Sequence, residues 1–126
     1  MSSDYKELRV WRDAMALVRD IYRLTRRLPK EETFGLVSQM RRAAVSVPSN
    51  VAEGKGRHSQ RELAQFLYRA RGSLLELETQ VLIARDLGYI DESICVGVGQ
   101  QIKKLACTLN GLINRVQEGI ASGLLR

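Results

Sequence analysis

The 126-residue sequence has few of the side chains that build catalytic or metal sites: one histidine, His58, and two cysteines, Cys95 and Cys107. A di-metal centre in a helical bundle needs several inward glutamates and Glu-x-x-His pairs, which a single histidine excludes. The cysteines lie about 18 Å apart if they share one helix, too far for a disulfide, and their apolar neighbours favour small core residues over reactive thiols. His58 is interpreted as a solvated loop residue. We therefore expect no metal, no cofactor and no enzymatic activity.

The sequence also has only two prolines, no low-complexity segment and no long apolar run. Without a linker, the chain is predicted to form one domain over residues 1–126. No run approaches the roughly 18 apolar residues of a membrane span, and the N-terminus is charged where a signal peptide would be apolar. These features predict a cytoplasmic protein.

Positive charge is in excess. Twenty Lys and Arg residues stand against 14 Asp and Glu, which gives a net charge of +6. Such an excess favours anionic partners, either nucleic acid or acidic protein surfaces.

Apolar residues recur at steps of three and four in four segments, which is the spacing of amphipathic helices. Ser59 and Glu62 have the form of a capping box, and Asp91 is a good N-cap residue. Short connections and the lack of strand periodicity predict an all-α fold, an antiparallel up-and-down four-helix bundle. The predicted helices span residues 6–28, 33–54, 59–87 and 91–116, followed by an irregular tail, 117–126.

Pro48 lies inside the predicted second helix. Proline removes a backbone donor and presses on the carbonyl four residues earlier, so the helix is expected to bend or break. Because the apolar stripe keeps its phase across Pro48, we expect a kink.

The first helix carries a ridge of basic side chains. At about 100° per residue they fall within about 60° of one another, opposite the apolar face. A phosphate backbone needs several cations in register, so the ridge suggests nucleic-acid binding. The alternative is a solvated face partly balanced by Asp13 and Asp20. The predicted nucleic-acid-binding residues, including one in the turn after the second helix, are Arg12, Arg19, Arg23, Arg26, Lys30 and Arg57.

Polar side chains form rows on the second and third helices. Since a buried charge must be paired, the arginines in these rows are expected to pair with glutamates of neighbouring helices or chains. A ligand site is the less favoured alternative. The residues assigned to this network or interface are Arg42, Ser46, Asn50, Glu53, Arg69, Ser73, Glu76 and Glu78.

The third helix has a second apolar strip beside its core seam. A four-helix bundle has little depth, so such a strip is expected to be covered by another subunit. We predict a homo-oligomer whose interface includes Tyr68, Leu75, Leu82 and Ile83. Gly72 weakens the same helix and suggests close backbone approach there.

Five segments taken together resemble a known family: Val10–Ala14, Phe34–Gly54, Phe66–Leu67, Ala70–Gln80 and Leu87–Ile90. The chain resembles the four-helix-bundle, ribosomal-protein-like family encoded in intervening sequences of bacterial 23S rRNA genes. The resemblance implies a small cytosolic bacterial protein that forms a ring-like homopentamer and has no known enzymatic activity. The chain also looks related to the accessory variability determinant of diversity-generating retroelements, a basic pentamer that binds nucleic acid.

These observations predict a non-enzymatic oligomeric bundle that binds structured RNA or DNA through its basic helix faces. The alternative is a homo-oligomeric scaffold or adaptor whose basic face binds an acidic protein partner.

Overall fold

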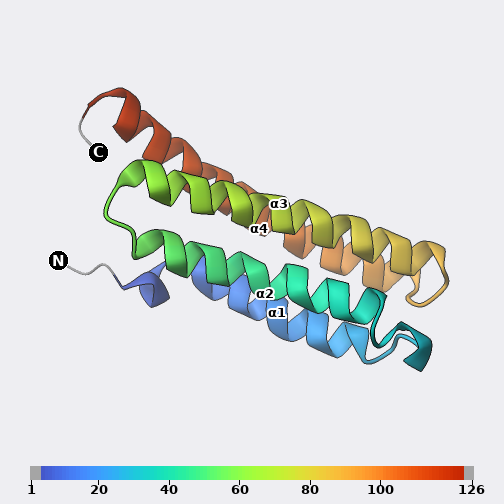
Figure 1. Ribbon diagram of the computed structural model, residues 1–126. Helices are drawn as coiled ribbons and strands as arrows, with labels where there is room; N and C mark the ends of the chain where they lie inside the picture. The colour runs from blue at the N-terminus through green and yellow to red at the C-terminus, as the bar shows by residue number, and fades with distance from the viewer. Residues whose placement is uncertain (1–3, 124–126) are drawn as a thin grey trace.

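The computed structural model describes residues 4–123 and contains four α-helices and no strand in that range. The helices are α1 (Arg9–Thr25), α2 (Leu36–Lys55), α3 (Gln60–Asp86) and α4 (Glu92–Ala121). They run side by side in alternating directions, with α2 between α1 and α3 (Figure 1). The predicted all-α four-helix fold is confirmed.

The core lies along the axis of the bundle, where each helix contributes one apolar stripe. Helix α1 packs beside α2 and α4, and α3 packs beside α2 and α4, whereas no Cα atoms of α1 and α3 lie within 8 Å of each other. The largest fully buried apolar side chains are Leu17, Ile21, Met40, Leu67, Leu74, Leu77, Ile102, Leu109 and Ile113. No helix in residues 4–123 is both long and apolar enough to cross a membrane.

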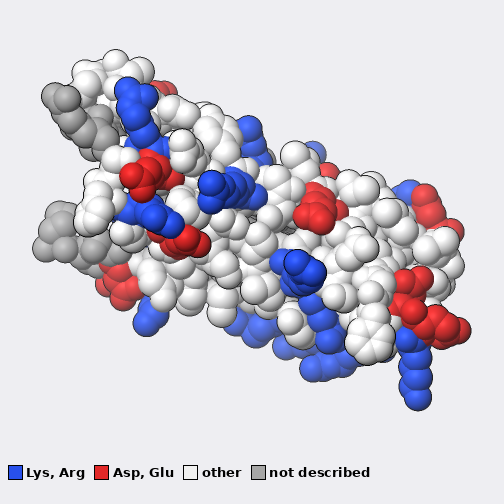
Figure 2. Space-filling model, in the orientation of Figure 1, with Lys and Arg blue, Asp and Glu red and all other residues white. Residues whose placement is uncertain are grey.

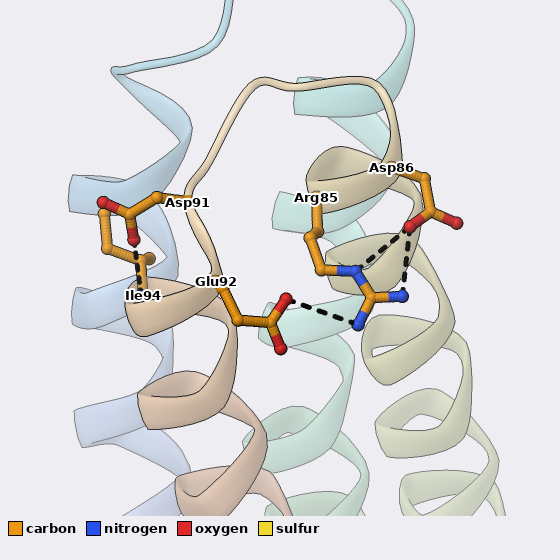
Figure 3. Close-up of polar contacts among 5 residues, drawn as sticks. All are labelled: Arg85, Asp86, Asp91, Glu92 and Ile94. Atoms are coloured by element: carbon orange, nitrogen blue, oxygen red, sulfur yellow. Dashed lines mark hydrogen bonds and ion pairs between the residues drawn. The ribbon is translucent and has the colours of Figure 1, made fainter.

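The predicted cap residues begin α3 and α4. Ser59 Oγ accepts a hydrogen bond from the Glu62 amide at 3.1 Å, and Asp91 Oδ1 accepts one from the Ile94 amide at 2.8 Å (Figure 3). Gly88 ends α3 with a positive φ of 81°, a conformation that a side chain would disfavour. The turn between the two helices is therefore specified by its own residues.

Arg85 connects the end of α3 to the start of α4. Its guanidinium lies 3.0 Å from Asp86 and 3.8 Å from Glu92 (Figure 3). The hydrogen bond to Asp86, the charge of Asp86 and that of Glu92 raise the pKa of Arg85, so its positive charge persists.

Some predicted boundaries differ from the observed ones. A one-turn 3-10 helix, Tyr5–Glu7, precedes α1, and another, Lys30–Glu32, precedes α2. Helix α4 continues beyond residue 116 to Ala121 because Ile120 packs against the core, so residues 117–121 of the predicted tail are helical. Residues 1–3 and 124–126, which belong to the predicted domain, lie outside the described residues.

Pro48 lies within α2, and its side chain is buried. The helix runs without interruption from Leu36 to Lys55, so it does not break at Pro48. The predicted kink is not confirmed.

A carboxylate joins the start of α2 to the turn after α3. Glu32 Oε1 accepts a hydrogen bond from the Leu36 amide at 3.0 Å, and Oε2 accepts one from the Tyr89 hydroxyl at 2.8 Å. A methyl group on Gly35 would lie 2.9 Å from Glu32 Oε1, so glycine leaves room for this carboxylate. The Leu36 and Tyr89 hydrogen bonds lower the pKa of Glu32, and the bond to Glu32 raises that of Tyr89.

Replacing Glu32 by glutamine is expected to lower the melting temperature and weaken its dependence on acid pH. The pKa of Glu32 is lower in the folded chain than its ordinary value of 4.5. Its stabilising contribution is therefore present above that value and is lost as the pH falls through the folded-state pKa. Melting curves of both proteins between about pH 3 and 7 measure this. If the melting temperatures of the wild type and Glu32→Gln still differ by the same amount at the acid end of this range, the stabilising role of the Glu32 carboxylate is contradicted.

Two glycines, Gly54 and Gly72, should respond oppositely to alanine. A methyl group on Gly54 would lie 2.9 Å from Phe66 Cβ and 3.1 Å from Leu63 Cδ1, whereas one on Gly72 would have no neighbour within 4 Å. The close approach predicted at Gly72 is thus wrong within this chain, and it occurs at Gly54, where α2 meets α3.

Gly54→Ala is expected to lower the free energy of unfolding by about 1–3 kcal/mol through overpacking. Gly72→Ala is expected to raise it by about 0.5–1 kcal/mol, because alanine is the better helix former. Urea titration of the two variants measures both values. A stabilising Gly54→Ala would show that α2 and α3 are not in close contact.

Candidate nucleic-acid interface

The arginine ridge comprises Arg12, Arg19 and Arg23 of α1 and Arg26, which directly follows α1, and all four side chains are exposed. From Arg12 to Arg26 the ridge extends about 21 Å along the helix. Blue side chains gather along the lower edge of the molecule, beneath α2, where α1 lies (Figure 2). The structure therefore brings the predicted α1 cations onto one outer surface.

The ridge arginines differ in their hydrogen-bond and ion-pair partners. Arg12 Nη1 donates to the Glu7 carbonyl at 2.8 Å, and Arg23 Nη1 lies 3.0 Å from Asp20 Oδ1. Within residues 4–123, Arg19 and Arg26 make no ion pair. These two carry the positive charge that is freest to meet an anion.

The other two predicted cations lie off the ridge. Lys30 is exposed in the 3-10 helix beyond the end of α1, near Arg26 in sequence. Arg57 lies in the α2–α3 turn, at the end of the bundle where α1 begins (Figure 1). It pairs with Glu53 at 2.7 Å, and its guanidinium lies 4.7 Å from the centre of the Phe66 ring. Arg57 is therefore largely satisfied within its own turn.

The polar rows of α2 and α3 meet through hydroxyl groups. Ser73 Oγ donates to Ser46 Oγ at 2.8 Å, and Asn50 Nδ2 donates to Ser46 Oγ at 2.9 Å and to the Ser46 carbonyl at 2.8 Å. Beside them is a groove of about 380 Å³, which is also lined by Gln39, Arg42 and Glu76. Part of the predicted polar network thus exists and is partly buried.

The ion pairs predicted for this network are absent from the described chain. Arg69 lies over the Phe66 ring at 4.5 Å instead of pairing with a glutamate. Arg42 is exposed and has no ion pair in this part of the chain, and neither has Glu78. Exposure to water removes the need for a partner that the prediction assumed. Glu76 accepts only a long, 3.4 Å, hydrogen bond from Gln80.

The second apolar strip of α3 is exposed, as its spacing indicated. Leu75 is 60% exposed, and Tyr68, Leu82 and Ile83 are also exposed. A shallow groove of about 170 Å³ beside Leu75 runs between α3 and α4. The strip has no cover within residues 4–123.

Cys95 is buried, but Cys107 is exposed, so the predicted core position of Cys107 is wrong. Cys107 lies two residues from both Leu105 and Leu109, whose side chains face the core, and this spacing turns it outward. In the part of the chain that the structure describes, no three histidine, cysteine or acidic side chains form a group that could hold a metal ion.

Two neighbouring features were missed by sequence reasoning. Phe34, in the turn before α2, is 96% exposed. The Arg41 guanidinium lies 4.4 Å from the centre of the Tyr22 ring, and its Nε donates to Thr25 Oγ1 at 2.9 Å. A large apolar residue just before a helix usually packs against an apolar residue at the fourth helical position. That position here is the polar Gln39, which is the one sign in the sequence that Phe34 lacks this contact.

Comparison with known proteins places the fold in a family. A crystal structure of a protein of unknown function from the S23 ribosomal protein family of Bacteroides thetaiotaomicron is similar, with a TM-score of 0.77 and 18% sequence identity. The similarity covers 82% of this chain and 97% of that one. No curated protein matches the sequence. The family model for 23S rRNA-intervening sequence proteins matches residues 6–111, and the chain belongs to that family.

Proposed function

We propose that the protein is a non-enzymatic homo-oligomer that binds structured RNA or DNA through the arginine ridge of α1. The observation that carries this proposal is the pair of exposed arginines, Arg19 and Arg26, that have no counter-ion within the described chain. They lie two helical turns apart, about 10 Å, on a surface that also holds Arg12 and Arg23. Several cations at such spacing match the repeated charges of a phosphate backbone.

The oligomeric part of the proposal rests on the exposed apolar strip of α3. Because no Cα atoms of α1 and α3 lie within 8 Å of each other, the two helices are not neighbours in the bundle, and an interface on the outer face of α3 is expected to leave the α1 ridge uncovered. Each subunit then presents one ridge, and a weak contact at each ridge is strengthened by avidity.

The absence of a catalytic role is supported by the chemistry of the side chains. Within residues 4–123, neither His58 nor a cysteine forms a hydrogen bond or an ion pair with an acid or a base. A nucleophile needs such a partner for activation. Binding is therefore the function proposed.

The family name supports RNA as the first ligand to test, because it refers to a segment of the 23S rRNA gene. The sequence resemblance to the accessory variability determinant supports nucleic-acid binding by analogy. An acidic protein is the other class of ligand that the ridge would suit.

The test is titration of labelled structured RNA and duplex DNA with the full chain at about 50 mM salt, with the mass of the protein measured by light scattering. Saturable binding by an oligomer is expected. No binding at this low salt would overturn the proposal and favour the acidic protein partner. A partner that survives nuclease treatment in a pull-down would then support the scaffold or adaptor role.

A further inference from the structure

Phe34 stands at the rim of a groove on the α1–α2 side of the bundle. The groove has a volume of about 600 Å³, and its apolar walls include Tyr22, Val37 and Val45. With 96% of its surface exposed, the Phe34 ring presents a large apolar face that nothing in residues 4–123 covers. Such a face beside a groove marks a binding surface.

The same groove is rich in positive charge. The Arg41 guanidinium lies over the Tyr22 ring, and it donates to Thr25 Oγ1 at 2.9 Å and to the Tyr22 carbonyl at 3.4 Å. Arg42 also lines the groove and has no ion pair in the described chain. Arg19 and Arg26 are neighbours of Tyr22 on α1, three residues before it and four after it. The groove therefore adjoins the two freest cations of the ridge.

One hydroxyl adds a directed donor. Ser46, which lines the groove, already accepts hydrogen bonds at its Oγ from Asn50 and Ser73. A hydroxyl group can donate as well as accept, so Ser46 can also form a hydrogen bond with a ligand in the groove. The groove combines a flat ring, guanidinium groups and a hydroxyl donor.

This combination fits an unpaired nucleotide. A base offers two flat faces that stack on aromatic rings and guanidinium planes, and its edge accepts hydrogen bonds, while the attached phosphate needs a cation nearby. A purely apolar partner would cover Phe34 but would make no use of the positive charges of Arg42 and Arg26 beside it. A nucleic-acid strand can stack a base on the Phe34 ring and place its phosphates beside the arginines.

We infer that the Phe34 groove binds an unpaired base of a nucleic-acid strand whose neighbouring phosphates lie on the arginine ridge. This inference rests on the proposed function and adds a specificity to it. The protein distinguishes loops, bulges and single strands from continuous duplex, because a base inside a duplex cannot enter the groove.

The experiment compares the wild type with Phe34→Trp, which keeps an aromatic ring, and Phe34→Leu, which keeps an apolar side chain without one. The probes are an RNA hairpin with 2-aminopurine in its loop and an RNA duplex with the same number of phosphates and no unpaired base. Wild type and Phe34→Trp are expected to bind the hairpin at least about 5-fold more tightly than the duplex and to quench 2-aminopurine fluorescence. Phe34→Leu is expected to lose at least about 5-fold in hairpin affinity, the lower end of what one stacked base contributes, while its duplex affinity stays the same.

Equal affinity of the wild type for the two RNAs, or unchanged hairpin binding by Phe34→Leu, would overturn the inference while leaving the proposed function standing. A fall in the mass of the Phe34→Leu assembly would also overturn it, because the groove would then be covered by a second copy. If the proposed function itself is wrong, the wild type would bind neither RNA, so the two failures can be told apart.

Discussion

Replacing Arg19 and Arg26 together by glutamate is expected to reduce the affinity for structured RNA at least about 100-fold. Each replacement removes a charge-assisted contact to phosphate, which contributes about 1.5–3 kcal/mol, and adds a repelling charge. Because each 1.4 kcal/mol is a tenfold change in affinity, two such losses amount to two decades or more. Both side chains are exposed, Arg19 on α1 and Arg26 directly after it, so helix content and melting temperature should be unchanged.

The matched control for this variant is Arg61→Glu combined with Lys103→Glu. Both residues are exposed, on α3 and α4, away from the ridge. Because Lys103 lines the groove beside Leu75, light scattering must also show that the control keeps the mass of the wild type. Each double variant lowers the net charge by four, from +6 to +2, so the two proteins differ only in where the charge is removed. If the control loses as much affinity as the ridge variant, binding depends on overall charge and the ridge is not the site.

Replacing Leu75 by aspartate is expected to dissociate the oligomer into folded monomers of 14.2 kDa. Leu75 is 60% exposed in the isolated chain, so the bundle does not need it for its own core. At a subunit interface the same change would bury an unpaired carboxylate in apolar surroundings, which costs several kcal/mol for each contact. Light scattering measures the mass, and circular dichroism shows that the helices persist.

Gln100→Asp provides the control for this change, because Gln100 is an exposed polar residue of α4 and lies outside the α3 strip. Its mass should equal that of the wild type. An unchanged mass for Leu75→Asp would show that the strip of α3 is not the interface, and a monomeric wild type would contradict the oligomer itself.

The four helices follow from the sequence because the apolar period is regular, but the boundaries depend on contacts that the period does not encode. Leu28 continues the apolar spacing of α1 and is buried, yet it lies in the turn beyond Thr25. The apolar period therefore predicted a helix end at residue 28, beyond the observed end at Thr25. At the other end of the chain, an irregular tail was predicted from residue 117, whereas the core contact of Ile120 extends α4 to Ala121.

The ridge was predictable because exposure on a straight helix depends only on the angle around its axis. The ion pairs of the polar rows were not predictable, because they depend on how two helices are placed relative to each other. Arg69 meets an aromatic ring of its own helix, and Arg42 meets no acid in the described chain. The α1–α2 groove depends on the turn before α2, where Gly35 and Glu32 fix the backbone and leave Phe34 outside.

The most direct test of nucleic-acid binding through the ridge is the salt dependence of RNA affinity, measured by fluorescence anisotropy for the wild type and for the Arg19→Glu and Arg26→Glu double variant. If the wild type contacts three or four phosphates, its affinity is expected to fall about 40- to 150-fold between about 50 and 200 mM salt. Any binding that the double variant retains should depend less on salt, because fewer phosphates are contacted. Wild-type binding that is insensitive to salt, or equal slopes for the two proteins, would contradict the ridge as the binding site.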